Sequence, residues 1–319
     1  MSDTAGRVGV VVMSHGTPRA LDQLLPFYTE IRRGSPPSPE QLADLERRYR
    51  AIGGASPLND RTNEQVLGLG RALEVMAPGR FVVAGGAKFA DPRIEDAVAE
   101  LGRAGVERAV GIVLAPHSAE VSVGEYARRA RAAAVAVEDG PLPIDIVDHW
   151  HLAPGFTELL ARRVRDALDA LPPDVRRGAV VLFTAHSVPM RAIDAGDPYA
   201  AQVQQTAQQV AEEAMLERWE VCWQSAGRTD DVWLGPDLLT VIATLADAGE
   251  TAVVVCPAGF VSDHLEVLYD VDVEAHALAA KLGLRLARTA SLNADPRFCE
   301  VLARVVLSAA GAPGLRGTH

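Results

Sequence analysis

Short runs of apolar, β-branched residues alternate along the chain with longer segments that have the period of a helix. The runs predict strands over 8–13, 80–85, 109–115, 144–148, 179–184, 220–224 and 252–257. Helical segments lie between them, and those over 95–105 and 240–249 close on the glycine that commonly ends a helix. Apolar strands that alternate with helices indicate an α/β protein whose parallel sheets are covered on both faces.

A weak internal repeat divides the predicted strands into two groups. SHGTP (14–18) follows the first strand and AHSVP (185–189) follows the fifth, so that His-x-x-Pro comes after a strand in both halves. A single sheet of seven strands stays open as an alternative, but a length of 319 residues favours two domains. We therefore expect an N-terminal lobe over 1–150 and a C-terminal lobe over 151–290.

Composition and charge narrow the class of protein. Apolar residues make up 48% of the chain and charged residues 23%, which is typical of a soluble globular protein. No apolar run reaches the roughly 20 residues of a membrane span, and the N-terminus lacks the features of a signal peptide. We expect a cytoplasmic protein without integral membrane association. A net charge of −11 argues against nucleic acid as a partner.

Polar side chains follow most of the predicted strands. Ligands of open parallel sheets bind beyond the carboxyl ends of the strands. The residues found there are His15, Lys88, His117, His149, His186, Gln224, Ser225 and the segment that begins at Ser262. One such histidine is more often a packed core residue, but five of the eight histidines, including the one in the segment from Ser262, lie at or just beyond a strand end. This concentration predicts a cleft that handles protons or a metal ion.

An acidic stripe is expected on a helix over 262–274. Glu266, Asp270 and Glu274 recur every four residues and therefore share one helical face. Like charges at this spacing repel by roughly 0.2–0.5 kcal/mol per pair. The stripe is either an ordinary solvated surface, or a path that guides divalent cations, which would offset this repulsion. Beside an apolar wall the pKa of Glu266 would rise, which would suit this carboxyl to proton transfer.

The most basic region of this acidic chain lies over 31–62. It holds Arg32, Arg33, Arg47, Arg48 and Arg61. Arg47 and Arg48 either decorate a helix, paired with Glu46, or bind carboxylates beside the GGASP turn, whose backbone N–H groups are exposed. The region is therefore a candidate site for an anionic small molecule.

Longer blocks of the sequence resemble the ferrochelatases, which insert ferrous iron into a porphyrin. The blocks are SHGTP, YTEIRRG, LERRYRAIGGASPLN, LAPHSAEVSVGEYARRA, FTAHSVP, WQSAGRTDDVWLGPDL and AGFVSDHLEVLYDVDVE. They occur in the family's order from about residue 8 to residue 307. Within the family, the chain is most similar to the soluble monofunctional enzymes that act on coproporphyrin III, through its IRRG and RRYRAIGG blocks and the lack of a C-terminal membrane-associating extension.

The resemblance implies a lyase of two Rossmann-like lobes that hold the porphyrin between them, with the C-terminal helix of segment 291–319 packed back on the first lobe. It implies that His186 and Glu266 carry metal binding and catalysis, and that Asp270 and Glu274 form a path for protons or metal. The implied porphyrin-binding residues are His15, Arg32, Arg48, Tyr49, Ser56 and Tyr126. The expected partners are coproporphyrin III and ferrous iron, and the enzyme is expected to be a monomer.

His15 departs from the family pattern. The coproporphyrin enzymes typically carry a tyrosine in this block, and its oxygen can approach the metal of the product. An imidazole is generally a better ligand for iron than a neutral phenol, so His15 is a candidate axial ligand. No cofactor beyond the substrate iron is expected. The three scattered cysteines are one short of the four thiolates that an iron–sulfur cluster normally takes.

Other functions stay open from the residues alone. Protoporphyrin IX is the alternative substrate, and a cobalt or nickel chelatase acting on a related tetrapyrrole would use the same histidine and carboxylate chemistry. A two-lobed binding protein without catalytic activity would clamp a ligand between similar lobes. A serine hydrolase built on Ser118 or Ser187 is disfavoured, because the chain lacks G-x-S-x-G.

Overall fold

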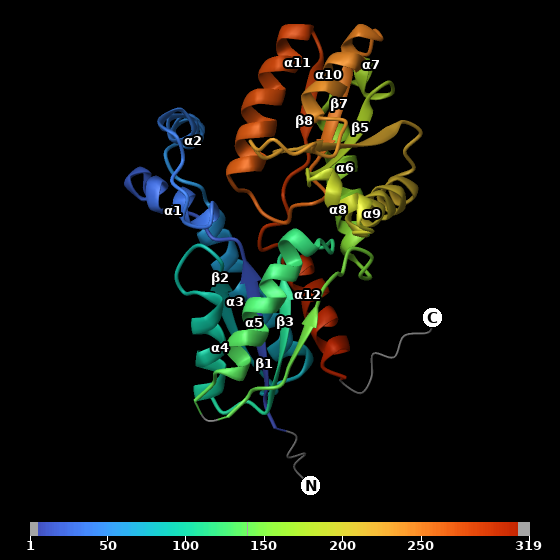
Figure 1. Ribbon diagram of the computed structural model, residues 1–319. Coiled ribbons are helices and arrows are strands. Elements are labelled where there is room, and N and C mark those ends of the chain that lie inside the picture. The colour runs from blue at the N-terminus through green and yellow to red at the C-terminus, as the bar shows by residue number, and fades with distance from the viewer. Residues whose placement is uncertain (1–5, 139, 312–319) are drawn as a thin grey trace.

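The computed structural model describes residues 6–138 and 140–311, which form two lobes, each built on a four-stranded parallel sheet (Figure 1). The strand order is β2-β1-β3-β4 in the first sheet and β6-β5-β7-β8 in the second. The strands are β1 (Val8–Ser14), β2 (Phe81–Ala87), β3 (Arg108–Val113), β4 (Ile144–Val147), β5 (Val180–His186), β6 (Trp219–Gln224), β7 (Ala252–Cys256) and β8 (Arg285–Arg288). The prediction of two Rossmann-like α/β units is confirmed.

The sequence pattern predicts seven of these strands and misses β8. The sequence of β8, RLAR, has a charged residue at each end, and the strand pairs on one side only, with β7. An edge strand of this kind needs fewer apolar side chains than a central one. Residues 1–5 and 312–319, which fall within the expected terminal segments, lie outside the described residues. Within the described ranges, no helix is both long and apolar enough to cross a bilayer.

Successive residues of β1 face opposite sides of the first sheet. Val10 and Val12 belong to one apolar cluster, whereas Val11 and Met13 belong to another. Helices cover both clusters: α3 (Leu58–Met76) and α12 (Pro296–Ala309) on one face, and α4 (Ile94–Arg103) and α5 (Glu125–Val135) on the other. The strand is apolar at nearly every position because both of its faces are buried.

The second lobe repeats this arrangement around β5. Val181 and Phe183 face one layer of helices, and Val180 and Leu182 face the other. The first layer contains α6 (Phe156–Ala170) and α9 (Tyr199–Ala214), and the second contains α10 (Leu238–Asp247) and α11 (His276–Leu282). Two short helices, α7 (Pro173–Arg176) and α8 (Met190–Asp194), lie at the two ends of β5 along the chain.

Helix α12 follows the second lobe in the sequence but packs against α3 of the first lobe (Figure 1). Gly68 of α3 allows the close approach, since a Cβ atom there would lie 2.4 Å from the Sγ atom of Cys299. The ring of Trp150 lies 5.0 Å from that of Phe156 in α6 and 5.8 Å from that of Phe298 in α12. One apolar cluster therefore runs through both lobes and joins them.

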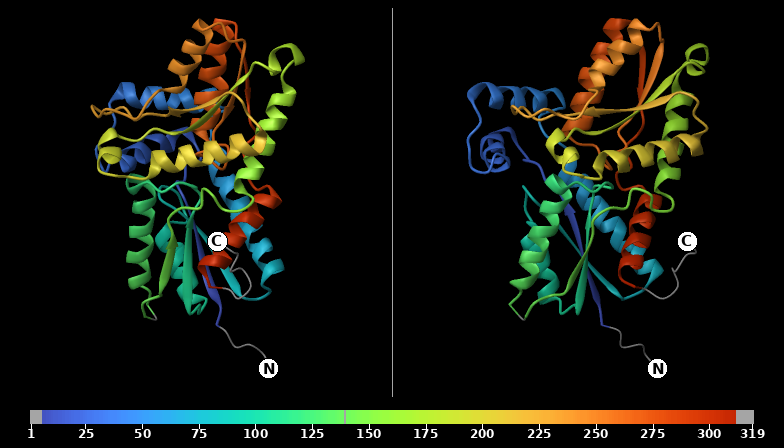
Figure 2. Two further views of the ribbon diagram at one scale, coloured as in Figure 1. Left: turned by 90° about the vertical axis from the view of Figure 1, so that its right-hand side faces the viewer. Right: turned by 45° about the vertical axis from the view of Figure 1, so that its right-hand side comes forward.

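An arm of two helices projects from the first lobe beside the second (Figure 2). A 3-10 turn (Leu21–Gln23) leads into α1 (Leu24–Ile31), and α2 (Pro39–Ala51) follows. Ser38 and Gln41 form a capping box at the start of α2, where Pro39 takes the first helical position. Helix α2 contacts η3 (Val267–Ala275), a π-helix of the second lobe. A second π-helical segment, η2 (Glu120–Gly124), precedes α5.

The junction of the lobes can be tested at Phe298. This side chain is fully buried beside Trp150, so Phe298→Ala creates a cavity. We expect the free energy of unfolding to fall by about 3–5 kcal/mol, as measured by chemical denaturation. Val75→Ala in α3 is the control, because Val75 is 82% exposed, and its effect should stay below about 0.5 kcal/mol. A loss as small as the control's for Phe298→Ala would contradict this packing.

Candidate active site

His186 is the last residue of β5 and places its imidazole at the carboxyl edge of the second sheet. The strand before it is buried from Val180 to Ala185, so its backbone is rigid. The ring Nδ1 atom hydrogen-bonds to the backbone oxygen of Ser187, and the hydroxyl of Tyr199 donates to the backbone oxygen of His186 at 3.0 Å. A carbonyl oxygen only accepts, so Nδ1 carries a proton and Nε2 faces the rest of the site.

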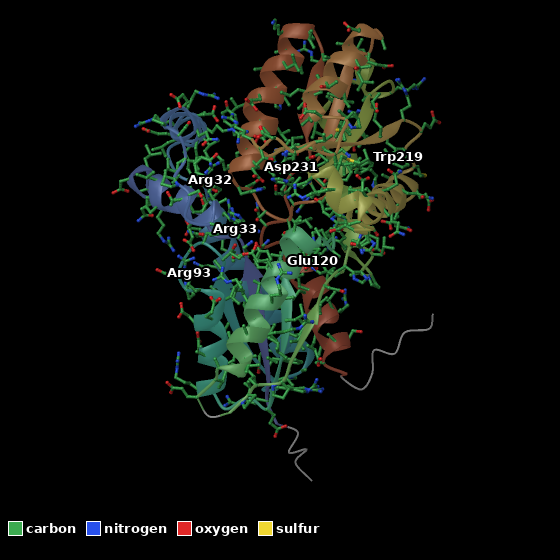
Figure 3. All side chains as sticks on the ribbon, viewed as in Figure 1. Arg32, Arg33, Arg93, Glu120, Trp219 and Asp231 are labelled. Atoms are coloured by element: carbon green, nitrogen blue, oxygen red, sulfur yellow. The ribbon has the colours of Figure 1, made fainter. Side chains whose placement is uncertain are left out.

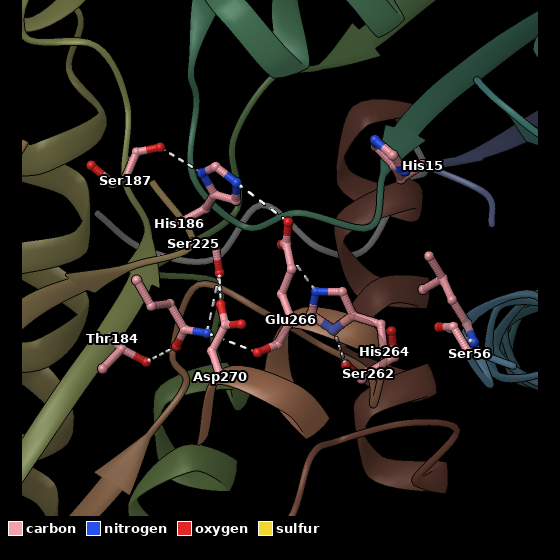
Figure 4. A network of polar contacts seen from close by, with 12 residues as sticks. His15, Ser56, Thr184, His186, Ser187, Ser225, Ser262, His264, Glu266 and Asp270 are labelled. Carbon is pink, nitrogen blue, oxygen red and sulfur yellow. Dashed lines mark hydrogen bonds and ion pairs between the residues drawn. The ribbon is translucent and has the colours of Figure 1, made fainter. Parts of the chain in front are cut away.

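Glu266 lies between two imidazoles (Figure 4). Its Oε1 atom is 3.5 Å from Nε2 of His186, and its Oε2 atom is 3.5 Å from Nε2 of His264. Partial burial, which leaves the two side chains 37% and 32% exposed, disfavours charge on both members of the His186–Glu266 pair, but their mutual attraction prevails. It raises the pKa of His186 to about 9 and holds the pKa of Glu266 well below its usual value. The expectation that the pKa of Glu266 rises is therefore wrong, because cationic partners outweigh the desolvation.

His264 completes this group; the sequence places it at a strand end only as part of the segment from Ser262 and assigns it no role. Its ring packs on Phe260 with centroids 4.8 Å apart, and its Nδ1 atom lies 3.1 Å from the backbone oxygen of Ser262. The signal was present, because the residue belongs to the SDHLE segment that follows β7. A histidine two residues before a glutamate can reach its carboxylate where the chain turns between them.

Polar contacts also fix the backbone that carries Glu266. The hydroxyl of Thr184 donates to the side-chain oxygen of Gln224 at 2.7 Å, and the Gln224 amide donates to the backbone oxygen of Glu266 at 3.2 Å. Ser225 follows with a φ of 59°, a left-handed conformation that is uncommon for serine. Its hydroxyl donates to Asp270. The ends of β5 and β6 thus anchor the first turn of η3.

The predicted acidic helix is a π-helix, and its stripe is not a solvated face. Asp270 is buried, with its side chain 8% exposed, and its Oδ1 atom lies 2.6 Å from Nη2 of Arg48. Glu274 is more exposed, 4.0 Å from the same nitrogen. Burial raises the pKa of Asp270 to about 6, although Arg48 acts in the opposite direction. Helices of this rare type are frequent at functional sites.

His15 comes from the other lobe, at the end of β1 (Figure 4). Its ring packs on Phe89 with centroids 4.8 Å apart, and its Nδ1 atom donates to the backbone oxygen of Gly16 at 2.9 Å. His15 as a whole is exposed, but partial loss of hydration against these rings lowers the pKa of its imidazole, while the charge of Glu266 acts in the opposite direction. The imidazole is therefore neutral near pH 7 with a free lone pair on Nε2, which is the form that binds a metal.

The other predicted porphyrin-binding residues occupy different places in the first lobe. Arg32 lies on the arm beside Arg33 (Figure 3), and its Nε atom donates to the backbone oxygen of Ser35 at 3.2 Å. Ser56 is half-buried just before α3. Tyr49 is buried and its hydroxyl lies 2.7 Å from that of Thr17; burial raises its pKa to about 12.

Tyr126 is a core residue of the first lobe. Lys88 lies over its ring, 5.0 Å from the centroid, and pairs with Glu125 at 2.7 Å. Burial raises the pKa of the Tyr126 hydroxyl far above its usual value. The hydrogen bonds and ion pairs of the described residues do not link Tyr126 with His186 or Glu266.

Two of the strand-end histidines serve other purposes. His117 is buried and bonds Thr206 of α9 through Nε2 at 2.9 Å, and burial lowers its pKa to about 3. His149 is exposed and pairs with Asp148.

Ser187 donates its hydroxyl to the backbone oxygen of Leu234 at 2.7 Å, which leaves it unsuited to act as a nucleophile. In the described part of the chain, no three or more His, Cys, Asp or Glu side chains form a metal-holding group.

Two parallel-sheet lobes, with a histidine and a carboxylate at the strand ends of one and an imidazole at the strand end of the other, define a chelatase-type enzyme. The fold agrees, since the cobalt-bound sirohydrochlorin chelatase SirB from Bacillus subtilis subspecies spizizenii matches with a TM-score of 0.55 at 12% identity, over 96% of this chain and 97% of that one. The family model described as Ferrochelatase matches residues 7–310. The chain belongs to the ferrochelatase family.

Two curated relatives refine this similarity. The coproporphyrin III ferrochelatase of Geobacillus thermodenitrificans is 44% identical over 302 residues, which cover 94% of this chain and 95% of the relative. The protein of the same name from Bacillus subtilis is 41% identical over 307 residues, which cover 96% and 98%. The similarity extends over both lobes.

Asp270 should leave a signature in the pH dependence of stability. Its pKa is about 6 in the folded protein and about 3.9 in an unfolded chain. The neutral carboxyl therefore favours folding at low pH, and this contribution is lost as the pH rises through the folded value. Asp270→Asn stays neutral, so its unfolding free energy should rise relative to wild type by up to about 3 kcal/mol between about pH 4 and pH 7.

Chemical denaturation at a series of pH values measures this difference. The control is Asp247→Asn at the exposed end of α10, for which the difference from wild type should be flat over the same range. A flat difference for Asp270→Asn as well would contradict the raised pKa.

Proposed function

We propose that this chain inserts ferrous iron into coproporphyrin III and releases two protons for each porphyrin. The observation that carries the proposal is the placement of Glu266 within 3.5 Å of two imidazoles. A carboxylate with a histidine on each oxygen can both stabilise a dication and accept the protons that the dication displaces. The relatives from Geobacillus thermodenitrificans and Bacillus subtilis are named coproporphyrin III ferrochelatase, which supports this substrate.

Metal insertion requires the porphyrin ring to bend and lose two N–H protons. Strain of roughly 1–5 kcal/mol can be drawn from binding energy at the ring edges, and it exposes the nitrogen lone pairs. We propose that His186 and Glu266 meet these nitrogens. His186 carries a proton in the resting pair, so its lone pair becomes available only after that proton leaves. Glu266 would pass protons onward through Asp270 and Glu274 to solvent.

His15 would act from the first lobe. Its neutral imidazole, held by Phe89 and the Gly16 carbonyl, can donate the Nε2 lone pair to iron along the axis of the ring. His15 would thus stand on the opposite side of the macrocycle from His186. The neutral form suits this role because a protonated ring has no lone pair to offer.

The carboxylates of the substrate would bind the arm and the turn that follows it. Arg32 and Arg48 supply guanidinium groups, and Tyr49 and Ser56 supply hydroxyls nearby in the chain. Coproporphyrin III has four propionates where protoporphyrin IX has two, so an arginine-rich arm favours the former. Tyr126 would contribute indirectly, by holding Lys88 at the end of β2.

We also propose an organisation that fits this function. The lobes would divide at residue 150, with 1–150 and 151–290 as units and the segment from 291 returning to the first. The two sheets on either side of residue 150 and the contact of α12 with α3 support this division. We further propose that the enzyme is a cytoplasmic monomer. It would need no resident cofactor, because ferrous iron is itself the substrate.

The substrate test is anaerobic incubation with ferrous iron and either coproporphyrin III or protoporphyrin IX. We expect free-base fluorescence to disappear with coproporphyrin III at a kcat/KM at least about tenfold higher than with protoporphyrin IX, which corresponds to one carboxylate contact of roughly 1.5 kcal/mol. A preference for protoporphyrin IX would overturn the choice of substrate. Turnover of neither porphyrin would overturn the proposed function itself.

The role of His186 is tested separately from binding. His186→Ala should abolish detectable iron insertion while coproporphyrin III still quenches tryptophan fluorescence with an affinity within about threefold of wild type. His149→Ala is the control, since His149 is exposed and contacts Asp148. Turnover by His186→Ala within about tenfold of wild type would reject the assigned role.

A further inference from the structure

Arg48 is engaged on three sides by the second lobe. Its Nη2 atom lies 2.6 Å from Oδ1 of Asp270 and 4.0 Å from Oε2 of Glu274, and its guanidinium lies over the ring of Tyr269 at 4.8 Å from the centroid. Arg48 belongs to α2, on the arm of the first lobe, so these contacts cross from one lobe to the other. A guanidinium paired with Asp270 in this way is not free to bind a substrate carboxylate.

The pairing of Arg48 is incomplete. Its Nε atom is buried and has no hydrogen-bond partner, although the side chain as a whole is 21% exposed. An arginine binds a carboxylate best through two parallel N–H donors, and the single short contact with Asp270 does not use that geometry. The unsatisfied Nε donor therefore favours a second carboxylate that can engage two nitrogens together.

We propose that Asp270 and a propionate of the substrate compete for Arg48. Asp270 binds this arginine in the empty enzyme, and the propionate binds it in its place when the porphyrin enters. The inference rests on the proposed function, because it takes a carboxylated porphyrin as the competitor. When the porphyrin takes Arg48, Asp270 loses its cation while its proximity to Glu266 is unchanged. The same transfer thus fills the carboxylate-binding position and leaves Asp270 without its cationic partner.

The remaining contacts of the arm are consistent with such a transfer. Arg47 donates to the hydroxyl of Tyr269, and Arg228 of the second lobe pairs with Asp44 of α2 at 2.6 Å. These pairs hold α2 beside η3 whether or not Arg48 contacts Asp270. The Arg48 side chain can therefore exchange partners while its helix stays in place.

The test is coproporphyrin III binding in the absence of metal, followed by fluorescence quenching near pH 8. Asp270→Asn keeps the size of the side chain but removes the competing charge, and we expect the dissociation constant to fall by about fivefold or more. The matched control is Asp272→Asn, which removes the same charge from the same helix. Asp272 pairs with Arg288, not Arg48, and its substitution should change the affinity by less than about twofold.

The second arm of the experiment places Asp270→Asn in an Arg48→Met background. Arg48→Met alone should weaken binding, and in that background Asp270→Asn should no longer tighten it. An unchanged or weaker affinity of Asp270→Asn, or an equal gain in the absence of Arg48, would overturn the inference. Thermal unfolding confirms that each variant is folded, and Asp270→Ser replaces Asp270→Asn if that variant does not fold.

Iron turnover by the wild type separates this inference from the proposed function. If the wild type metallates coproporphyrin III but Asp270→Asn binds it no more tightly, only the competition for Arg48 is overturned. If the wild type neither binds nor metallates coproporphyrin III, the proposed function and the inference both fail.

Discussion

The ionised pair of Glu266 with His186 is the interaction on which the rest of the site depends. Both groups lose hydration where they lie, and each alone would resist its charge. Together they remain charged, because a cation and an anion 3.5 Å apart attract each other even though about a third of each side chain is exposed. The second imidazole, His264, adds to this balance from the other oxygen of Glu266. A dication that binds there meets the Glu266 carboxylate in its ionised form.

The fold provides the precision that such a pair needs. His186 ends a strand buried on both faces, and Glu266 is held through the Thr184–Gln224 contact at the ends of the neighbouring strands. The π-helix that follows is tied on one side to Arg48 and on the other to Arg288, which pairs with Asp272 at 2.7 Å. Opposite faces of one helix are thus fixed by arginines from different lobes, which couples the acidic residues to the arm.

The relation between the lobes is set by apolar packing rather than by the site. Trp150, Phe156 and Phe298 join the segment after β4 with α6 and α12 in one apolar cluster. The polar contacts between the arm and the π-helix are made by other residues, in the last turns of α2. This separation allows an arginine to change partners without loosening the core, since ion pairs with solvent access contribute less than buried apolar contacts.

The sequence by itself determined the α/β class, seven of the eight strands found in residues 6–138 and 140–311, the family and the residues at the strand ends, because apolar period and chain order are local properties. It could not supply β8, whose edge position relaxes the pattern, or His264, whose importance comes from Glu266 alone. The sequence also could not give the direction of the pKa shift at Glu266. Apolar neighbours in the chain suggest desolvation, but the opposing charge of His186 comes from a strand 80 residues earlier. Only the tertiary structure decided that Arg48 meets Asp270, because electrostatic energy depends on distance in space and not on separation along the chain.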